Sequence, residues 1–238
     1  MSRDEHHGLF GEPPARDARF LVRERWKDLD NFPPEDPRHL LEFLHRQMNE
    51  EVNGLEIAAR NLADFPSADW ELRLAIARQC WDEARHIELF RFVLERRGGR
   101  VGQFPVMNFQ YRITANLDSL IGRLAVQNRS FEAAGLDAIH DSLEKARSEP
   151  DLGELLDTQL ADELQHVRYA NEWVPRLLER HGARATFELV RCVAQAEAAL
   201  LQVAGQAGVR YPIAEELRRE AGFSDAEIET VKAFPSAS

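Results

Sequence analysis

The sequence predicts an all-α protein whose main part is a four-helix bundle around a two-metal site. Two observations predict this fold. Apolar residues return at helical spacing along several long segments, and one pattern of carboxylates and histidines occurs twice, about eighty residues apart. The first copy is Glu51-Val52-Asn53-Gly54-Leu55-Glu56 with Asp82-Glu83-Ala84-Arg85-His86, and the second is Glu132-Ala133-Ala134-Gly135-Leu136-Asp137 with Asp162-Glu163-Leu164-Gln165-His166.

Each copy offers one lone Glu and one Glu-x-x-His. Residues three apart on a helix lie on the same face, so each Glu-x-x-His can present a carboxylate and an imidazole to one metal. Four carboxylates and two histidines are the ligand set of a two-iron centre in a helical bundle, and these hard ligands suit iron or manganese better than zinc or copper. We expect Glu51, Glu83 and His86 to hold mainly one ion and Glu132, Glu163 and His166 the other, with Glu83 and Glu163 bridging. The alternative is a set of surface charges on solvated helix faces.

The breaks between the helices give an independent test of this ligand set. The chain breaks at Phe65-Pro66-Ser67, fourteen residues after Glu51 and sixteen before Glu83. It breaks again at Ser148-Glu149-Pro150, sixteen residues after Glu132 and thirteen before Glu163. At about 1.5 Å rise per residue, antiparallel helices bring both members of each pair to nearly the same height.

The chain begins with an expected extended strap, residues 1–35, whose Phe20, Trp26 and Phe32 pin it to the bundle. The bundle follows over residues 36–181. Its first helix should start at Asp36-Pro37, a capping residue followed by proline, and run to about residue 64. A second helix, about 67–97, is stopped by Gly98-Gly99.

A connection of roughly fifteen residues, 98–112, is long enough to be the single long crossover of a bundle with two hairpins. A third helix is expected over about 115–147 and a fourth over about 151–181, ended by Gly182, with Pro175 ending or kinking its regular part. Residues 182–238 should add C-terminal helices, namely 183–204, 213–220 and 225–233, the last opened by the capping box Ser224-Asp225-Ala226-Glu227.

Several residues near the expected ligands have a predicted role. Asp82 and Asp162 precede the carboxylates expected to bridge and should orient the metal-bound imidazoles, because such a ring needs an acceptor on its other nitrogen. The alternative is that they are surface aspartates. Gly54 and Gly135 follow each lone Glu by three residues; they either leave room for dioxygen or substrate, or allow tight helix packing. Polar helix contacts are expected of Glu56 and Asp137. Buried apolar positions are expected of Cys80, Met48, Trp81, Phe90 and Phe131.

The composition of the chain argues against several classes of protein. The chain has 238 residues and a net charge of −11, which argues against nonspecific binding to nucleic acid or anionic membranes. No apolar run approaches the length that spans a membrane, and the polar first residues do not form a secretory signal. Two unpaired cysteines, Cys80 and Cys192, fit a reducing compartment, so a cytoplasmic location is expected.

Together these motifs resemble the ferritin-like superfamily of two-iron carboxylate proteins. More narrowly, the segments 51–56, 130–137, 162–168 and 219–223 are similar to a bacterial family of ferritin-like proteins of undefined function, and more distantly to tRNA-modifying two-iron hydroxylases. Asp82 to His86 resembles the motif of bacterial two-iron hydroxylases, in which the Asp of one repeat holds the His of the other. The resemblance therefore implies that Asp162 supports His86 and that Asp82 supports His166.

We therefore expect an enzyme with two iron ions, or iron with manganese, that uses O2 to oxidise or oxygenate a small organic substrate. An electron-donor protein is an expected partner, and the sequence leaves a homodimer open. One alternative is iron oxidation or storage, although storage proteins have shorter bundles without this strap and tail. The other is a metal-free structural or interaction protein.

Overall fold

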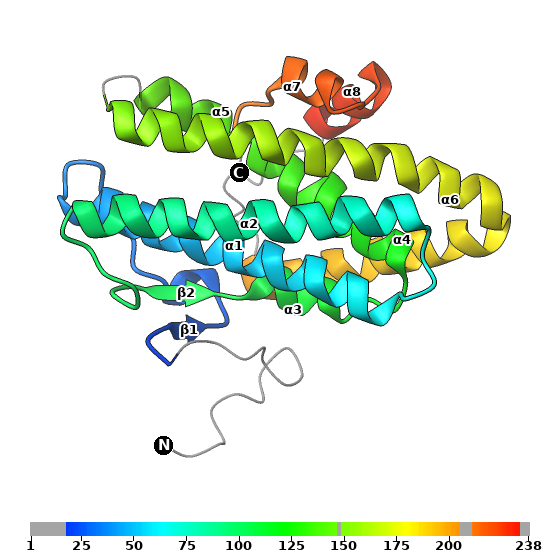
Figure 1. Ribbon diagram of the computed structural model, residues 1–238, viewed down its shortest axis with the longest axis horizontal. Coiled ribbons are helices and arrows are strands. Elements are labelled where there is room, and N and C mark those ends of the chain that lie inside the picture. The colour runs from blue at the N-terminus through cyan, green and yellow to red at the C-terminus, as the bar shows by residue number, and fades with distance from the viewer. Residues whose placement is uncertain (1–17, 147–148, 205–210, 234–238) are drawn as a thin grey trace.

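The structure, a computed structural model, describes residues 18–146, 149–204 and 211–233 and is an all-α helical bundle, as predicted (Figure 1). The first hairpin of the bundle is formed by α1 (Arg38–Asp64) and α2 (Trp70–Arg96). The second is formed by α4 (Leu120–Arg123), the continuous run of η3 (Leu124–Glu132) and α5 (Ala133–Lys145), and the first part of α6 (Pro150–Ala204).

The first hairpin begins and ends close to the predicted points. The Asp36 carboxylate accepts the backbone N–H of Arg38 at 2.8 Å, so it caps α1 as expected. Beyond α2, Gly98 has a φ of +83°, a left-handed conformation that glycine adopts without a steric penalty. Two apolar clusters fill the bundle on either side of its middle, one around Leu44, Met48 and Phe90 and the other around Leu72 and Ile76.

The connection between the hairpins runs the length of the bundle (Figure 1). It contains β2 (Pro105–Met107) and α3 (Phe109–Ala115), and β2 pairs in parallel with β1 (Leu21–Arg23) of the strap. Beyond β1 lies a short 3₁₀ turn, η2 (Trp26–Asp28). The strap aromatics make the expected contacts: the centroid of Phe20 lies 5.7 Å from that of His45, and the centroid of Phe32 lies 5.7 Å from that of Phe104. Residues 1–17 of the strap lie outside the described residues.

The expectation of one α-helix over 115–147 was wrong. The chain bends after α3, and Ser119 restarts it by accepting the backbone N–H of Gly122. Arg123 stabilises the bend because its buried guanidinium donates to the carbonyls of Leu117 and Ala115. The next segment, η3, is a π-helix that ends at Glu132. Long π segments are rare, and their wider turn changes the direction in which a side chain points.

The fourth helix ends where it was expected to end, because the backbone of α6 leaves the helical range at Gly182, with φ 55° and ψ −137°. Pro175 does not end the helix, since the backbone stays in the helical range there. The two short C-terminal helices, α7 (Glu215–Glu220) and α8 (Asp225–Ala233), lie where they were predicted. Ser224 and Glu227 form the expected reciprocal cap. In the described part of the chain, no helix combines the length and apolar character needed to cross a membrane.

Candidate metal centre

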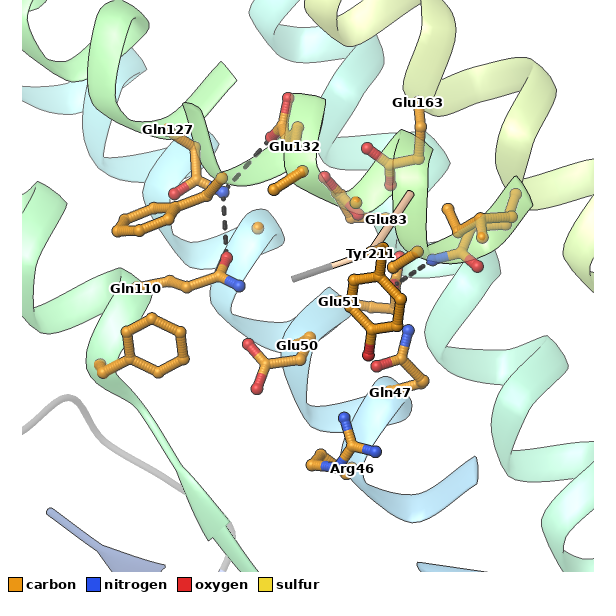
Figure 2. Close-up of a pocket in the computed structure, with 18 of the residues that line it drawn as sticks. Arg46, Gln47, Glu50, Glu51, Glu83, Gln110, Gln127, Glu132, Glu163 and Tyr211 are labelled. Atoms are coloured by element: carbon orange, nitrogen blue, oxygen red, sulfur yellow. Dashed lines mark hydrogen bonds between the residues drawn. The ribbon is translucent and has the colours of Figure 1, made fainter. Parts of the chain in front are cut away.

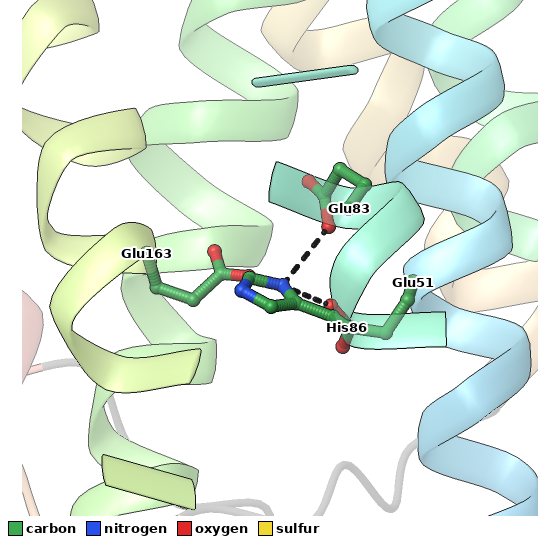
Figure 3. Close-up of side chains that lie close together, drawn as sticks. All are labelled: Glu51, Glu83, His86 and Glu163. Atoms are coloured by element: carbon green, nitrogen blue, oxygen red, sulfur yellow. Dashed lines mark hydrogen bonds and ion pairs between the residues drawn. The ribbon is translucent and has the colours of Figure 1, made fainter. Parts of the chain in front are cut away.

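The six residues that the repeat singled out come together in the middle of the bundle. Glu51 lies on α1, Glu83 and His86 on α2, Glu132 at the end of η3, and Glu163 and His166 on α6. Each is at most 7% exposed, so the charges are inside the protein and not on solvated faces. Figure 3 shows Glu51, Glu83 and Glu163 around the ring of His86.

The two histidines present the same ring nitrogen to the carboxylates. His86 Nδ1 lies 2.8 Å from Glu51 Oε2, 3.6 Å from Glu83 Oε2 and 3.8 Å from Glu163 Oε1 (Figure 3). His166 Nδ1 lies 3.7 Å from Glu83 Oε1 and 3.5 Å from Glu163 Oε2. Glu83 and Glu163 therefore each turn one oxygen toward one histidine and the other oxygen toward the second, which is the arrangement expected of bridging carboxylates.

Two groups of ligand atoms result, each lying within 4.8 Å of one another. One contains Glu51, Glu83, His86 and Glu163, and the other contains Glu83, Glu132 and His166. Around an octahedral ion with bonds of about 2.1 Å, neighbouring ligand atoms lie roughly 3 Å apart and opposite ones roughly 4 Å apart. The spacing in the cluster is of this size.

The other nitrogen of each histidine meets an aspartate of the opposite repeat. His86 Nε2 lies 3.1 Å from Asp162 Oδ2, and His166 Nε2 lies 3.3 Å from Asp82 Oδ2. The crossed pairing implied by the resemblance is thus present. Arg85 binds both aspartates, and Arg78 Nε lies 3.2 Å from Asp82. These guanidinium groups hold both aspartates in place, which in turn orients the rings.

Two glutamines, which the sequence analysis did not single out, hold the lone glutamates. Gln79 Nε2 donates to Glu132 Oε1 at 2.6 Å and to Glu83 Oε1 at 2.9 Å, and Gln159 Nε2 donates to Glu51 Oε1 at 2.7 Å. Each glutamine binds the lone glutamate of the opposite repeat, as the aspartates do with the histidines. The signal was in the sequence, because both copies read Gln-x-x-Asp-Glu-x-x-His.

The environment of Glu132 is more polar than that of Glu51. Asn128 donates to Glu132 Oε2 at 2.6 Å, and the hydroxyl of Tyr169 donates to Gln79 Oε1 at 2.6 Å. Both Asn128 and Glu132 belong to η3, so the π-helix places this amide beside the carboxylate. By contrast, Gln159 Oε1 is buried and has no hydrogen-bond partner in the described structure.

Protons and imidazoles balance the buried carboxylates when no metal is bound. Burial raises the pKa of Glu51 well above its usual range, and burial with the nearby charge of Glu163 raises the pKa of Glu132 to about 8. Burial disfavours the charged form of His86, but hydrogen bonds to Glu51 and Glu83 raise its pKa to about 12. The pKa of His166 also rises, because burial is outweighed by its hydrogen bond to Asp82 and by the nearby negative charge of Glu163. The buried carboxylates thus favour the binding of positive charge, either as protons or as a cation.

Two buried polar atoms without hydrogen-bond partners also indicate a place where a cation can bind. Glu163 Oε2 and His166 Nδ1 face each other at 3.5 Å, and neither has a hydrogen-bond partner. Leaving a buried polar atom unpaired costs about 1–3 kcal/mol, so such atoms mark a place where something else binds. A carboxylate oxygen and an imidazole nitrogen aimed at one point fit a metal ion, and this cluster can hold one.

A cavity of about 220 Å³ opens beside the cluster, and four of the six predicted ligands line it, namely Glu51, Glu83, Glu132 and Glu163 (Figure 2). Gly54 and Gly135 line it too, but for different reasons. A Cβ on Gly54 would lie 2.6 Å from Glu83 Oε1, whereas a Cβ on Gly135 would meet nothing within 4 Å. Gly54 therefore allows the close approach of the Glu83 carboxylate, and Gly135 leaves open space.

The remaining nearby residues mostly follow the predictions. Asp137 is not a ligand: it forms a buried ion pair with Arg218 of α7 at 2.7 Å. Glu56 is half-buried and lies in neither ligand group. Met48 and Phe90 are in the core, and Cys80 packs against the second apolar cluster. Trp81 was wrongly predicted, because it is 66% exposed, and half-buried Phe131 lines the cavity.

Comparison with known protein families identifies the family to which the chain belongs. A family described as "Protein of unknown function (DUF455)" matches residues 4–229, and the chain belongs to this family. Neither the search of curated proteins nor the search of solved structures found a match.

Proposed function

We propose that this DUF455 protein is a two-iron carboxylate enzyme that uses O2 to oxidise or oxygenate a small organic molecule bound in the adjoining cavity. One observation carries the proposal: four buried carboxylates and two buried imidazoles converge on one place, and a cavity reaches the carboxylates. In a ferritin-like centre of this composition, Glu51 with His86 would hold one ion and Glu132 with His166 the other, and Glu83 and Glu163 would contribute to both.

Bound iron would supply the activation of O2 and part of the electrons that its reduction requires. The remaining reducing equivalents would come from a separate electron-donor protein. The contribution of the chain itself is orientation. The pairs formed by Asp162 with His86 and by Asp82 with His166 fix which ring nitrogen faces the ions.

The polar side chains around the cluster control protons and water. Gln79 and Gln159 donate to the lone glutamates and so favour their charged forms, the forms that bind a cation. Ala134, Ala138, Ile139 and Phe131 line the cavity beside the carboxylates, and this apolar surface limits the water that reaches the cluster. A substrate in the cavity would lie against Glu51, Glu83, Glu132 and Glu163 and would have little competition from solvent.

Metal content tests the proposal. Protein from iron-supplemented cells should contain about two irons per chain, and Glu83→Ala should lose them, since Glu83 belongs to both ligand groups. Glu56→Ala, which changes a carboxylate on the same bundle outside both groups, should retain them. Iron-free wild-type protein, or equal loss in both variants, would refute the metal centre.

Oxygen uptake separates catalysis from storage. Anaerobic ferrous protein exposed to O2 should consume it and then stop until a reductant is added. Continued oxidation of many added ferrous ions per chain, with retention of the product inside an assembly, would favour iron storage instead.

A further inference from the structure

One stripe of large, exposed apolar side chains runs along the outside of α2, a helix on the near side of the bundle in Figure 1. Trp70 is 67% exposed, Leu74 51% and Trp81 66%. Phe92 is 56% exposed, although the guanidinium of Arg96 lies 5.5 Å from the centroid of its ring. At about 100° per residue, the other three side chains of the stripe point within about 20° of the direction of Trp81, away from the metal cluster.

The area of the stripe is of the size that a protein interface uses. With about 200–250 Å² for each residue, the exposed fractions of Trp70, Trp81 and Phe92 amount to roughly 450 Å². Exposed apolar patches of more than a few hundred Å² commonly mark interaction sites. A stable interface takes about 800 Å² from each partner, so these three side chains supply about half of one side and their neighbours on α2 can supply the rest.

The spacing of the stripe makes it complementary to itself. Trp70 lies eleven residues before Trp81 and Phe92 lies eleven residues after it, so both are about 16.5 Å from Trp81 along the helix axis. If a second copy of α2 packs antiparallel across a two-fold axis at Trp81, the two Trp81 rings meet and each Trp70 comes level with Phe92 of the other copy. A two-fold interface requires the same patch to match itself in this way, whereas contact with a different protein does not.

The flanks of the stripe do not oppose such a pairing. On one side, the guanidinium of Arg85 binds both Asp82 and Asp162. Arg78 beside it binds Asp82, so these positive charges are balanced within each copy. On the other side, Ala77 is small and exposed, which lets a second helix approach to the usual axis separation of about 8–10 Å. Two copies can therefore pack here without bringing unpaired like charges together.

We propose that the outer face of α2 is the contact between two copies of this chain, which pack as an antiparallel pair centred on Trp81. The second copy is the occupant that the area and the symmetric spacing of the stripe fit. The proposal goes beyond the proposed function and does not rest on it, because no residue of the stripe belongs to either group of metal ligands. The pair should therefore form in metal-free protein and in protein given Mn²⁺.

Sedimentation velocity of the full chain tests the pairing. The unaltered chain should sediment as a dimer at about 10 µM and above. Trp81→Ala should weaken the dimer at least about 30-fold, because both copies lose an aromatic side chain at the centre of the interface. Phe187→Ala is the matched control, since it removes a ring that is 68% exposed on the part of α6 beyond Gly182, and it should leave the dimer unchanged.

Three results of this experiment would overturn the proposal. The first is a chain that stays monomeric up to about 100 µM, far above the dissociation constant of a standard-size interface. The second is a dimer that Phe187→Ala dissociates and Trp81→Ala does not. The third is a monomer that uses Trp81 to bind a separate protein, such as an electron donor. If Trp81→Ala does not fold by circular dichroism, the crosslinking of chains that retain Trp81 decides.

A pair of introduced cysteines tests the antiparallel register. Leu74 lies seven residues before Trp81 and Glu88 lies seven residues after it, so Leu74 of one copy should lie beside Glu88 of the other. A mixture of Leu74→Cys and Glu88→Cys chains should therefore be crosslinked by a bismaleimide of about 8 Å, a length matched to neighbouring helices. Neither variant alone should be crosslinked, because like positions lie about 21 Å apart along the axes. The unaltered chain, which retains Cys80 and Cys192, controls for the native thiols. Crosslinking of either variant with itself, or none in the mixture, would overturn the proposal.

Discussion

Replacing Gly54 by alanine should weaken metal binding without unfolding the protein. The added Cβ would lie 2.6 Å from Glu83 Oε1 and 2.8 Å from Glu83 Cδ, whereas ordinary contact begins near 3.4 Å. The carboxylate must therefore retreat by about 0.8 Å. In metal-free protein this retreat is easy, because the group is the end of a flexible side chain. Metal-ligand distances, however, tolerate only about ±0.2 Å, so a shift of this size would weaken the hold of Glu83 on any ion bound in the cluster.

The expected loss of metal affinity follows from the place of Glu83 in both ligand groups. Disturbing a residue that only orients a ligand already costs about 10-fold to 100-fold in metal affinity, so displacing a shared ligand should cost at least about 10-fold. Competition with a chromophoric chelator, using Fe²⁺ under anaerobic conditions and Mn²⁺ in air, measures the affinity. Urea unfolding of the metal-free protein measures the stability, which should rise or stay level because alanine favours a helix over glycine by about 1 kcal/mol.

Gly135→Ala is the matched control, because it adds the same methyl group at the equivalent position of the second repeat. Nothing lies within 4 Å of its Cβ, so metal affinity should be unchanged and helix stability should rise by up to about 1 kcal/mol. Wild-type affinity in Gly54→Ala, or equal losses in both variants, would show that Glu83 does not bind metal in the position seen here.

Three further outcomes are expected. Gln79→Leu and Gln159→Leu should each lower metal affinity about 10-fold to 100-fold, because they release Glu132 and Glu51. The control is Gln165→Leu, which should keep the affinity because the Gln165 amide oxygen accepts from Arg168 and not from the cluster. Equal affinities in all three variants would contradict the proposed role of Gln79 and Gln159. The pKa of Glu132 is raised from 4.5 to about 8, so the folded metal-free protein holds an extra proton whose stabilising effect is complete below about pH 4.5 and lost as the pH rises to 8. Urea unfolding should accordingly show lower stability at pH 8 than at pH 6, with a smaller pH dependence in Glu132→Gln; an unchanged slope would disprove the assignment. Asp137→Ala should destabilise the fold by about 3–5 kcal/mol because it leaves Arg218 buried without its partner, whereas Asp225→Ala breaks an exposed pair with Arg219 and should cost about 0–1 kcal/mol; similar losses would argue against the buried anchor.

The convergence of the six buried carboxylate and imidazole side chains was predictable because metal-binding chemistry dictates both residue type and spacing. A Glu-x-x-His places two ligands on one helix face, and equal distances from a turn place Glu51 opposite Glu83. Gln79 and Gln159 were overlooked for the complementary reason: an amide is seldom an iron ligand, so their matched position four residues before the bridging Glu suggested no chemistry. Their role becomes clear only when the opposite helix is in place.

Trp81 shows where a residue type misled the prediction. It lies two residues before Glu83, about 200° around the helix, so a helix that turns Glu83 inward must turn Trp81 outward. Phe90 lies seven residues after Glu83, about 20° away from its direction, and is buried as that angle requires. The angle around the helix relative to Glu83, which was expected to point inward, thus predicts the burial of Trp81 and Phe90 better than their hydrophobicity does.

The π-helix and the paired strands could not be predicted in the same way. The three residues of β1 and the three of β2 are too few to show an alternating pattern, and their pairing depends on the path of the crossover. The residues of η3 have an ordinary helical composition, and no local signal distinguishes a π-turn from an α-turn. Its position is set by long-range contacts, such as the hydrogen bond from Asn128 to Tyr169 of α6.

The crossed contacts explain why the centre requires the whole bundle. Each hairpin supplies carboxylates and an imidazole to the cluster, but side chains of the other hairpin orient them: Asp162 contacts His86, and Gln79 donates to Glu132. A single hairpin would therefore have carboxylates and an imidazole without fixed directions. Because an ion that binds only the assembled cluster stabilises the folded state by RT ln(1 + [M]/Kd), metal should raise the unfolding temperature of both hairpins together. A protease that cleaves the hairpins at different rates in metal-free protein should consequently cleave them at one slower rate once metal is bound, and unequal protection would mean that the ions occupy one hairpin alone.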